Sequence, residues 1–424
     1  MILQAPTRVF YGWRVIGAAM LLTALGGGVF SYGFSVFFLP MRETLGISAA
    51  SASLIFALSR AEGALEGPLA GYLIDRLGPR VMLGVGAFFM SIGYILLSTA
   101  QSYEAVLIIY LLVISVGVNC GFSHATMALV NAWFSKRRGF AMAVASAAPA
   151  LGGAIVAPVL GVAVGEIGWR SAAALAGIVV LVLTVPVLFV VRRSPESVGL
   201  RPDGDEPREI FVTGSTPPVE ETSYTAREAM RTTTFWLLLA ATMCRICVGS
   251  AITVHFVAIM VWKGMDETLG AAMLGVFALI SLPLRIFTGW MGDRYSRTLL
   301  LIVTLGTGAV SLTLLNYASG VLILWLFVAL FAWADSSTSL NWALIGDYFG
   351  RKQFATIRGY MSFFYGWANM AAPLLAGLVW DRTESYELVL WVFALVWVGG
   401  AVLFALLRPP GPRREPLLQP QPAA

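Results

Sequence analysis

The sequence predicts an all-α membrane protein whose twelve transmembrane helices form two pseudo-symmetric six-helix halves. Of its 424 residues, 58% are hydrophobic and only 12% are charged, which is about half the charged fraction of a typical soluble domain. The apolar residues come in blocks of about 20, the length that a helix needs to cross a ~30 Å hydrocarbon core. Short motifs also recur at nearly one offset in the two halves of the chain. This composition excludes a soluble enzyme.

The apolar blocks set the boundaries of the expected parts of the chain. We expect halves at 1–192 and 234–407, a cytoplasmic linker at 193–233 and a disordered cytoplasmic tail at 408–424. The linker contains RPDGDEPRE and TGSTPPVEE, which are too polar to bury a core. The expected helices run over 13–39, 49–75, 79–100, 104–132, 138–164, 171–192, 234–262, 267–292, 298–316, 321–347, 354–379 and 386–407.

Basic residues orient the chain, because Lys and Arg concentrate in cytoplasmic loops. Arg60, Arg245 and Arg285 fall within spans. If the N-terminus is inside, four basic residues face outward, and subtracting these seven leaves 21 of the 28 Lys and Arg on the inside. We therefore expect a multi-pass protein of the cell (plasma or inner) membrane with both termini in the cytoplasm. The four outward residues are Arg42, Arg170, Lys263 and Arg382.

An internal repeat relates the two halves. GYLIDRLGPR after the second expected helix recurs as GWMGDRYSR after the eighth, which puts Asp75 and Asp293 218 residues apart. Phe134 and Phe349, after the fourth and tenth helices, are 215 apart. Related halves joined by a polar linker suit a protein whose halves rock about a site at the membrane midplane. Coincidence of short motifs is the alternative.

These motifs resemble the loop signature of the major facilitator superfamily, and the resemblance covers the whole chain. YGWRVI, WFSKRRGFAMA and GWRSA, together with Arg285, resemble the branch of monocarboxylate transporters and oxalate–formate antiporters. The resemblance implies a secondary transporter that moves a small organic anion, a monocarboxylate, by alternating access, with proton symport or anion exchange. The expected partners are the anion, membrane lipids and protons; no cofactor, metal or nucleic acid is expected, and the protein is expected to be a monomer.

The resemblance also implies that the repeated loops are gates. Their charges would hold the cytoplasmic side closed while the site faces outward, and Arg138 would be a partner of the second copy. Their glycines would let backbones turn and approach closely. The alternative is that the charges only anchor the topology. The candidate gating residues are Gly71, Asp75, Arg76, Gly78, Arg80, Arg138, Gly289, Asp293 and Arg294.

Arg285 is the first candidate for binding substrate. It lies eight residues before Asp293, or about 12 Å along a helix, and so near the middle of the membrane. An ionisable group at this depth costs at least ~2.5 kcal/mol and is a functional candidate by default. Its guanidinium can hold a carboxylate through two parallel hydrogen bonds, and the resemblance implies the same role. The alternative is an ion pair with Glu62, Glu66 or Asp335.

Other polar residues at membrane depth are candidates for proton coupling or substrate binding. Glu62 and Glu66 share one helix face and could carry a proton or neutralise a buried arginine. Asp335 and His124 are the other proton-coupling candidates, and Arg245 is either a second anion contact or the partner of Asp335. Analogy with the superfamily places several of these residues along the cavity. The candidate substrate-binding residues are Arg285, Arg245, His124, Asn119, Tyr32, Asn369 and Tyr365.

The eleventh helix departs from the pattern of the branch. Dicarboxylate exchangers of the branch carry a lysine there, whereas this helix has none and offers Asn369 and Tyr365 at depth. This difference favours a singly charged anion. Two other functions stay open: an efflux carrier for hydrophobic or cationic compounds, and a non-transporting membrane sensor. An enzyme is disfavoured because the sequence offers no nucleophile–base pair, metal-ligand cluster or phosphate loop.

Overall fold

The computed structural model describes residues 10–204, 223–318 and 320–410, apart from the side chains at 39, 49, 50, 52, 53, 56, 57, 60, 61, 267 and 271. The centre of the expected linker and most of the expected tail therefore lie outside the described residues, as does the side chain of Arg60. The described parts of the chain contain helices and connections but no strand.

The first helix bundle begins at Tyr11 and ends at Val190. Its helices are α1 (Tyr11–Gly26), α2 (Gly33–Leu45), α3 (Ala49–Leu77), α4 (Pro79–Thr99), α5 (Tyr103–Ile109), α6 (Val116–Val118), α7 (His124–Trp133), α8 (Arg138–Ser146) and α9 (Ala148–Val190). Three π-helical turns, Gly27–Tyr32, Tyr110–Ser115 and Asn119–Ser123, join α1 to α2 and α5 through α7. Such turns occur often at functional sites, and two of them hold Tyr32 and Asn119.

The second bundle follows a short helix in the linker, α10 (Ala226–Met230). A capping box of Thr225 and Glu228 starts α10. The helices of the bundle are α11 (Thr233–Trp262), α12 (Glu267–Gly292), α13 (Arg297–Tyr317), α14 (Val321–Asp335), α15 (Thr338–Phe349), α16 (Phe354–Thr383) and α17 (Glu387–Ala405).

These helices match the expected twelve spans. Nine helical stretches of the described residues are long and apolar enough to cross a membrane. One of them, Arg138–Val190, is 53 residues long and turns at Gly168, whose φ is 76°, so it makes two crossings. The other two crossings are α3 and α16. They are 29 and 30 residues long, but they are more polar than the nine stretches above.

The outer surface of the bundles is apolar. Val159, Leu279 and Leu322 are 66%, 70% and 83% exposed, and many other large apolar side chains are exposed with them. Exposed apolar area on this scale marks a surface that meets another apolar phase, and for helices of this length that phase is the lipid bilayer.

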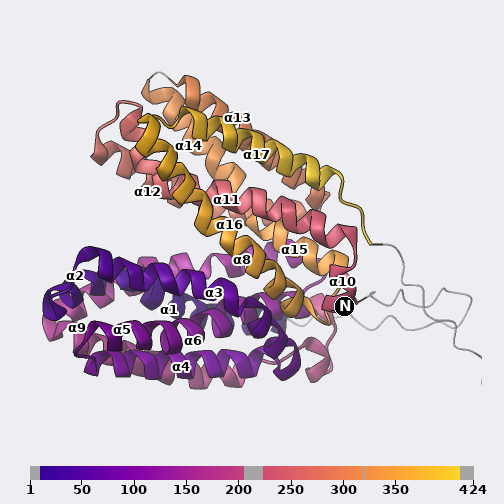
Figure 1. Cartoon of the computed structure of the whole chain (residues 1–424). Helices are drawn as coiled ribbons and strands as arrows, with labels where there is room; N and C mark the ends of the chain where they lie inside the picture. Colours follow the sequence, from indigo (N-terminus) through magenta and orange to yellow (C-terminus); the bar gives the residue numbers. More distant parts are fainter. Residues whose placement is uncertain (1–9, 205–222, 319, 411–424) are drawn as a thin grey trace, which may run out of the picture.

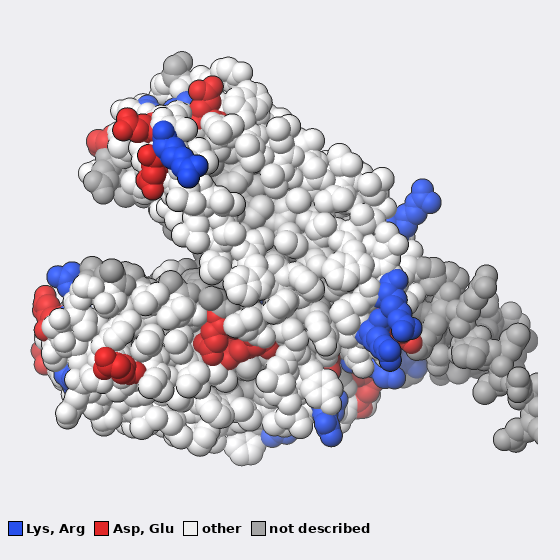
Figure 2. Space-filling model, in the orientation of Figure 1, with Lys and Arg blue, Asp and Glu red and all other residues white. Residues whose placement is uncertain are grey.

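The two bundles meet at one end of the molecule and diverge toward the other (Figure 1). The meeting end, called the closed end below, carries the connections at 77–79, 133–138, 292–297 and 349–354, and it is the end predicted to be cytoplasmic. Figure 2 shows a V-shaped cleft between the bundles that narrows toward the closed end.

Two helix pairs form the seam at the closed end. In the first pair, Gly67 of α3 lies against Gly359 of α16, and a Cβ added to Gly67 would lie 2.7 Å from the Gly359 carbonyl oxygen. In the second pair, a Cβ added to Gly289 of α12 would lie 2.7 Å from the carbonyl oxygen of Gly139 in α8. Glycine allows these backbones to touch, as in other close-packed membrane helices.

Candidate functional site

Arg285 forms an ion pair with Asp335 between two helices of the second bundle. Its Nη2 lies 2.6 Å from Asp335 Oδ2, and the two side chains are 26% and 21% exposed. Asp335 ends α14 at the short break before α15, and the Nε of Arg285 donates no hydrogen bond. Of the three carboxylates considered from the sequence, Asp335 is the one that Arg285 holds.

Arg245 lies beside this pair on α11. It is 6% exposed, and its Nη1 donates a hydrogen bond to Thr338 Oγ1 at 3.0 Å, while its Nε has no acceptor. Asp335, Arg285 and Tyr365 are near enough to act on its charge. One carboxylate therefore faces two arginines.

Arg358 is a buried arginine that the sequence analysis did not single out. It lies on α16, is 5% exposed, and its Nε and Nη1 donate no hydrogen bond. Its guanidinium carbon is 5.0 Å from the centre of the Trp342 ring, a distance at which a cation is attracted to the face of the ring. Arg358 is only five residues into its helix, and the distribution of basic residues along the sequence therefore places it among the cytoplasmic charges.

Glu62 and Glu66 form a separate acidic cluster in the first bundle. Glu62 lies near Ser115, and Glu66 lies near Glu62, Asn119 and Cys120. Buried Oε2 atoms of both glutamates have no hydrogen-bond partner. No ion pair among the described residues joins either glutamate to an arginine.

The remaining polar candidates take different positions. Asn119 donates a hydrogen bond to Ser115 Oγ at 3.0 Å and so belongs to the acidic cluster. His124 is 7% exposed, its Nδ1 has no partner, and Arg358 acts on its charge. Tyr32 is 45% exposed, and the backbone oxygen of Asn369 accepts a hydrogen bond from Ser250.

Tyr365 connects the buried arginines. Arg245 and Arg358 both act on its hydroxyl, and its ring centre is 5.5 Å from that of Trp342. In this part of the second bundle, two arginines, Arg285 and Arg245, therefore lie beside one carboxylate, Asp335, and Arg358 adds a third buried positive charge near Tyr365. An excess of buried positive charge favours an anionic ligand that supplies the missing partner.

Asp75 and Asp293 close the seam by capping helices of the opposite bundle. Asp75 accepts hydrogen bonds from the backbone N–H of Ala355 and Thr356, at 3.3 and 2.7 Å, at the start of α16. Asp293 accepts them from Gly139 and Phe140, at 2.7 and 2.9 Å, at the start of α8. A carboxylate at a helix N-terminus bonds free N–H groups and interacts favourably with the helix dipole. The two repeat copies make equivalent contacts across the seam.

Arg138 forms an ion pair across the same seam with Asp347, a residue that was not among the expected partners. The guanidinium is 3% exposed, and its Nη1 lies 2.7 Å from Asp347 Oδ1. Asp347 also bonds Arg297, whose Nη2 is 2.8 Å from Asp293. Asp347 and Arg297 therefore link Arg138 to the signature aspartate.

Two other arginines of the loop motifs, Arg76 and Arg294, have contacts within their own bundle. Arg76 donates a hydrogen bond to Tyr72 at 3.1 Å, and Arg294 lies 3.8 Å from the centre of the Trp290 ring. Arg80 is exposed. Gly78 has a φ of 93° and turns the chain between α3 and α4. The aspartates, rather than these arginines, make the contacts across the seam.

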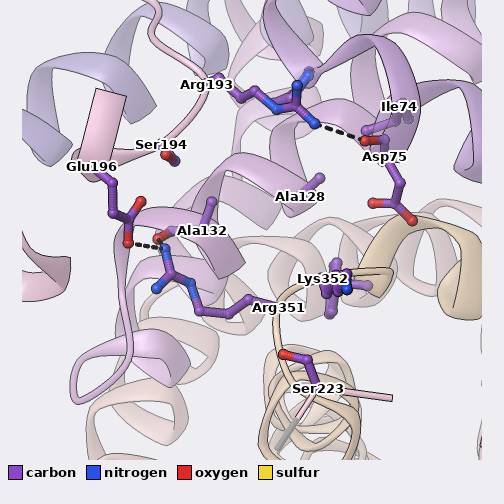
Figure 3. A pocket seen from close by; sticks show the side chains of 12 residues that line it. Ile74, Asp75, Ala128, Ala132, Arg193, Ser194, Glu196, Ser223, Arg351 and Lys352 are labelled. Carbon is purple, nitrogen blue, oxygen red and sulfur yellow. Dashed lines mark hydrogen bonds and ion pairs between the residues drawn. The ribbon is translucent and has the colours of Figure 1, made fainter. Parts of the chain in front are cut away.

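A pocket of about 370 Å³ lies at the closed end where both bundles meet the linker (Figure 3). Arg351 of the second bundle bonds Glu196 of the linker at 2.9 Å, and Arg193 donates to the Asp75 backbone oxygen at 2.9 Å. Burial alone would raise the pKa of Glu196, but hydrogen bonds from Ser194 and its own backbone, with the charge of Arg351, lower the pKa below its ordinary value. Glu196 therefore stays ionised at neutral pH, and the bridge adds a linker contact to the closed seam.

The sequence model of the Major Facilitator Superfamily matches residues 18–334 and 258–424. The chain belongs to the major facilitator superfamily. It is therefore a multi-pass membrane transporter rather than an enzyme, and the expected twelve-helix fold with two halves is confirmed.

The relatives and solved structures that are similar to this chain are also transporters. The oxalate:formate antiporter of Oxalobacter formigenes is 26% identical over 86% of this chain and 83% of its own. A probable sulfoacetate transporter of Cupriavidus necator is 25% identical over 87% of both chains, and monocarboxylate transporter 13 of Rattus norvegicus is 27% identical over 93% and 87%. The superfamily transporter FucP, solved in the outward conformation, superposes with a TM-score of 0.70 over 93% of this chain and 98% of its own, at 14% identity.

Proposed function

We propose that this transporter moves a small organic anion, with a monocarboxylate as the first candidate, across the cell membrane by alternating access. The observation that carries the proposal is the excess of positive charge around Asp335, where Arg285 bonds this one carboxylate and Arg245 lies beside it. A substrate carboxylate would supply the missing negative charge, and a guanidinium can bind it through two parallel hydrogen bonds.

The relatives support an anionic substrate. The three relatives described above are named for oxalate and formate, for sulfoacetate and for monocarboxylates, all of them small organic anions. At 25–27% identity they do not select one anion among these for this chain.

We further propose that the closed end faces the cytoplasm and that the protein acts as a monomer. The bias of basic residues toward this end supports the orientation. The cleft in Figure 2 would then face outward, and the caps made by Asp75 and Asp293 would break when the substrate is released inside.

Glu62 and Glu66 are the proposed site of a coupled proton. Glu62 and Glu66 lie side by side on α3, each with an Oε2 that has no hydrogen-bond partner among the described residues, and two neighbouring carboxylates can share one proton. His124 and Asp335 are the other proton candidates. A proton held by the two glutamates would couple transport to proton symport, and anion exchange is the alternative coupling mode.

Transport into proteoliposomes tests the proposed function. Labelled formate, lactate, oxalate and sulfoacetate are each offered to wild-type protein, to Arg285→Ala and to Arg285→Lys. We expect uptake of at least one anion by the wild type and none by either variant, because Arg285 is the substrate's main contact. Arg42→Ala, which removes an arginine at the open end, should retain uptake.

Two results would contradict the proposal. One is normal anion uptake by Arg285→Ala protein that reaches the membrane in wild-type amounts. The other is transport of tetraphenylphosphonium with no transport of any anion, which would favour an efflux carrier for hydrophobic cations.

A further inference from the structure

Arg358 differs from the other arginines that are buried at the seam or near Asp335. Arg138, Arg285 and Arg297 each bond an aspartate. Arg245 bonds Thr338 and has Asp335 nearby. The groups found near Arg358 are the Trp342 ring, Tyr365 and His124, none of which carries negative charge at neutral pH.

The surroundings of Arg358 leave it ready to bind an anion. Trp342 covers the guanidinium at 5.0 Å, while Nε and Nη1 remain without acceptors. A buried cation in this condition is costly unless a partner arrives at some stage of the protein's cycle. Packing against an aromatic ring offsets only part of that cost.

The position of Arg358 indicates at which stage the partner arrives. Thr356, whose N–H is capped by Asp75 across the seam, lies two residues earlier on α16, or about 3 Å along the helix. Gly359, the next residue, packs against Gly67 of α3. Arg358 therefore lies just inside the closed end, in the layer that has to separate before a substrate can leave there.

We propose that Arg358 is the anion contact on the cytoplasmic side of the transport path. It is shielded while α3 and α16 are in contact, and it binds the substrate's acidic group when they separate. This inference rests on the proposed function and adds a second binding position to it, closer to the cytoplasm than Arg285.

Tyr365 supplies the connection between the two positions. It lies seven residues after Arg358 on α16, which puts both on one helix face about 10 Å apart. Its hydroxyl is also near Arg245. Tyr365 therefore offers its hydroxyl, between Arg245 and Arg358, to an anion that moves from one arginine to the other.

The positive charge of Arg358 also affects the equilibrium between the states in which the cytoplasmic end is closed and opened. In the closed state Arg358 is desolvated and its Nε and Nη1 have no acceptor among the described residues, whereas in the opened state water or substrate reaches them. An interaction present in only one state shifts the equilibrium toward that state. Arg358 should therefore favour opening at the cytoplasmic end, and it should strengthen substrate binding from that side.

The test compares transport from the two sides of the membrane. Right-side-out and inside-out vesicles from the same cells are given labelled formate, lactate, oxalate and sulfoacetate, each measured separately. For Arg358→Met we expect the KM from the cytoplasmic side to rise at least about tenfold and the KM from the outer side to stay within about twofold. Arg358→Lys, which keeps the charge but not the planar donor group, should give an intermediate rise.

Arg170→Met is the matched control. Arg170 also lies over a tryptophan, 4.5 Å from the centre of the Trp169 ring, but at the open end of the first bundle. Its replacement removes the same kind of contact and should leave the cytoplasmic KM unchanged.

Three outcomes would overturn the inference. An unchanged cytoplasmic KM in Arg358→Met would show that no anion binds there, and equal increases on both sides would place Arg358 in a site shared by both states. If Arg358→Met does not reach the membrane, Arg358→Lys decides, and a symmetrical effect in that variant contradicts the inference. Failure of wild-type protein to transport any of the four anions would instead overturn the proposed function, and this inference with it.

Discussion

At the scale of single residues, Arg285 and Asp335 have two roles that mutation can separate. As an ion pair they join α12 to α14, and in the proposed function Arg285 also presents its guanidinium to the substrate. Both side chains are about one-quarter exposed, so water weakens the attraction between them. We therefore expect a coupling of about 1 kcal/mol, rather than the roughly 3–5 kcal/mol lost when a fully buried pair is broken.

A double-mutant cycle tests the structural role of the pair. Asp335→Asn should lower the Tm of the purified protein because it leaves Arg285 and Arg245 without an acid. Arg285→Gln in the same chain should recover part of that loss, while transport remains absent. Thermal unfolding in detergent measures both effects. Strictly additive losses would show that the two residues are not energetically coupled.

At the scale of helices, the closed end depends on two aspartates that cap helices of the opposite bundle. Asp75 caps the N-terminus of α16, and Asp293 caps the N-terminus of α8. The internal repeat relates these two contacts. Each carboxylate bonds N–H groups that have no partner within their own helix. The caps therefore act on the relative position of the two halves and not on helix formation alone.

Replacing either aspartate by asparagine should loosen the closed end. Asparagine keeps the size and one acceptor but loses the charge, which at a helix N-terminus is worth about 0.3–1 kcal/mol. A cysteine at Ser362, which is 4% exposed beside Gly67, reports opening through its reaction with a membrane-impermeant maleimide. With the three native cysteines replaced by alanine, Asp75→Asn and Asp293→Asn should each speed this labelling about two- to fivefold.

Asp266→Asn is the control for this measurement. Asp266 caps α12 within its own bundle at the open end, where it accepts from the Leu269 N–H at 3.0 Å. The same chemical change there should leave the labelling of residue 362 at the wild-type rate. Equal acceleration by all three variants would show that the labelling reports loss of stability and not opening of the seam.

At the scale of the whole molecule, two related halves touch at one end and leave a cleft at the other (Figure 2). The sequence was sufficient to predict the twelve helices, because apolar blocks of membrane length are a strong signal. The family resemblance implied charge contacts by Asp75 and Asp293 at the cytoplasmic side, and in the structure each aspartate caps a helix of the opposite bundle. Both predictions depend only on local patterns along the chain and not on how the helices pack.

The partners of buried charges could not be predicted in the same way. Whether Arg285 faces Glu62, Glu66 or Asp335 depends on the rotation and packing of α3, α12 and α14. Asp347, the partner of Arg138, looks in sequence like an ordinary acid at a helix end. Arg358 was overlooked because counting basic residues treats an arginine near a helix start as a loop charge, although packing against Trp342 buries it.

The measurement that tests the account most directly is the thermal stability of purified protein with small carboxylates at two pH values. A ligand that binds only the folded protein raises its Tm. The account predicts that at least one of formate, lactate, oxalate and sulfoacetate stabilises the wild type, and that Arg285→Ala loses this effect. Stabilisation by a carboxylate that persists undiminished in Arg285→Ala would contradict the account.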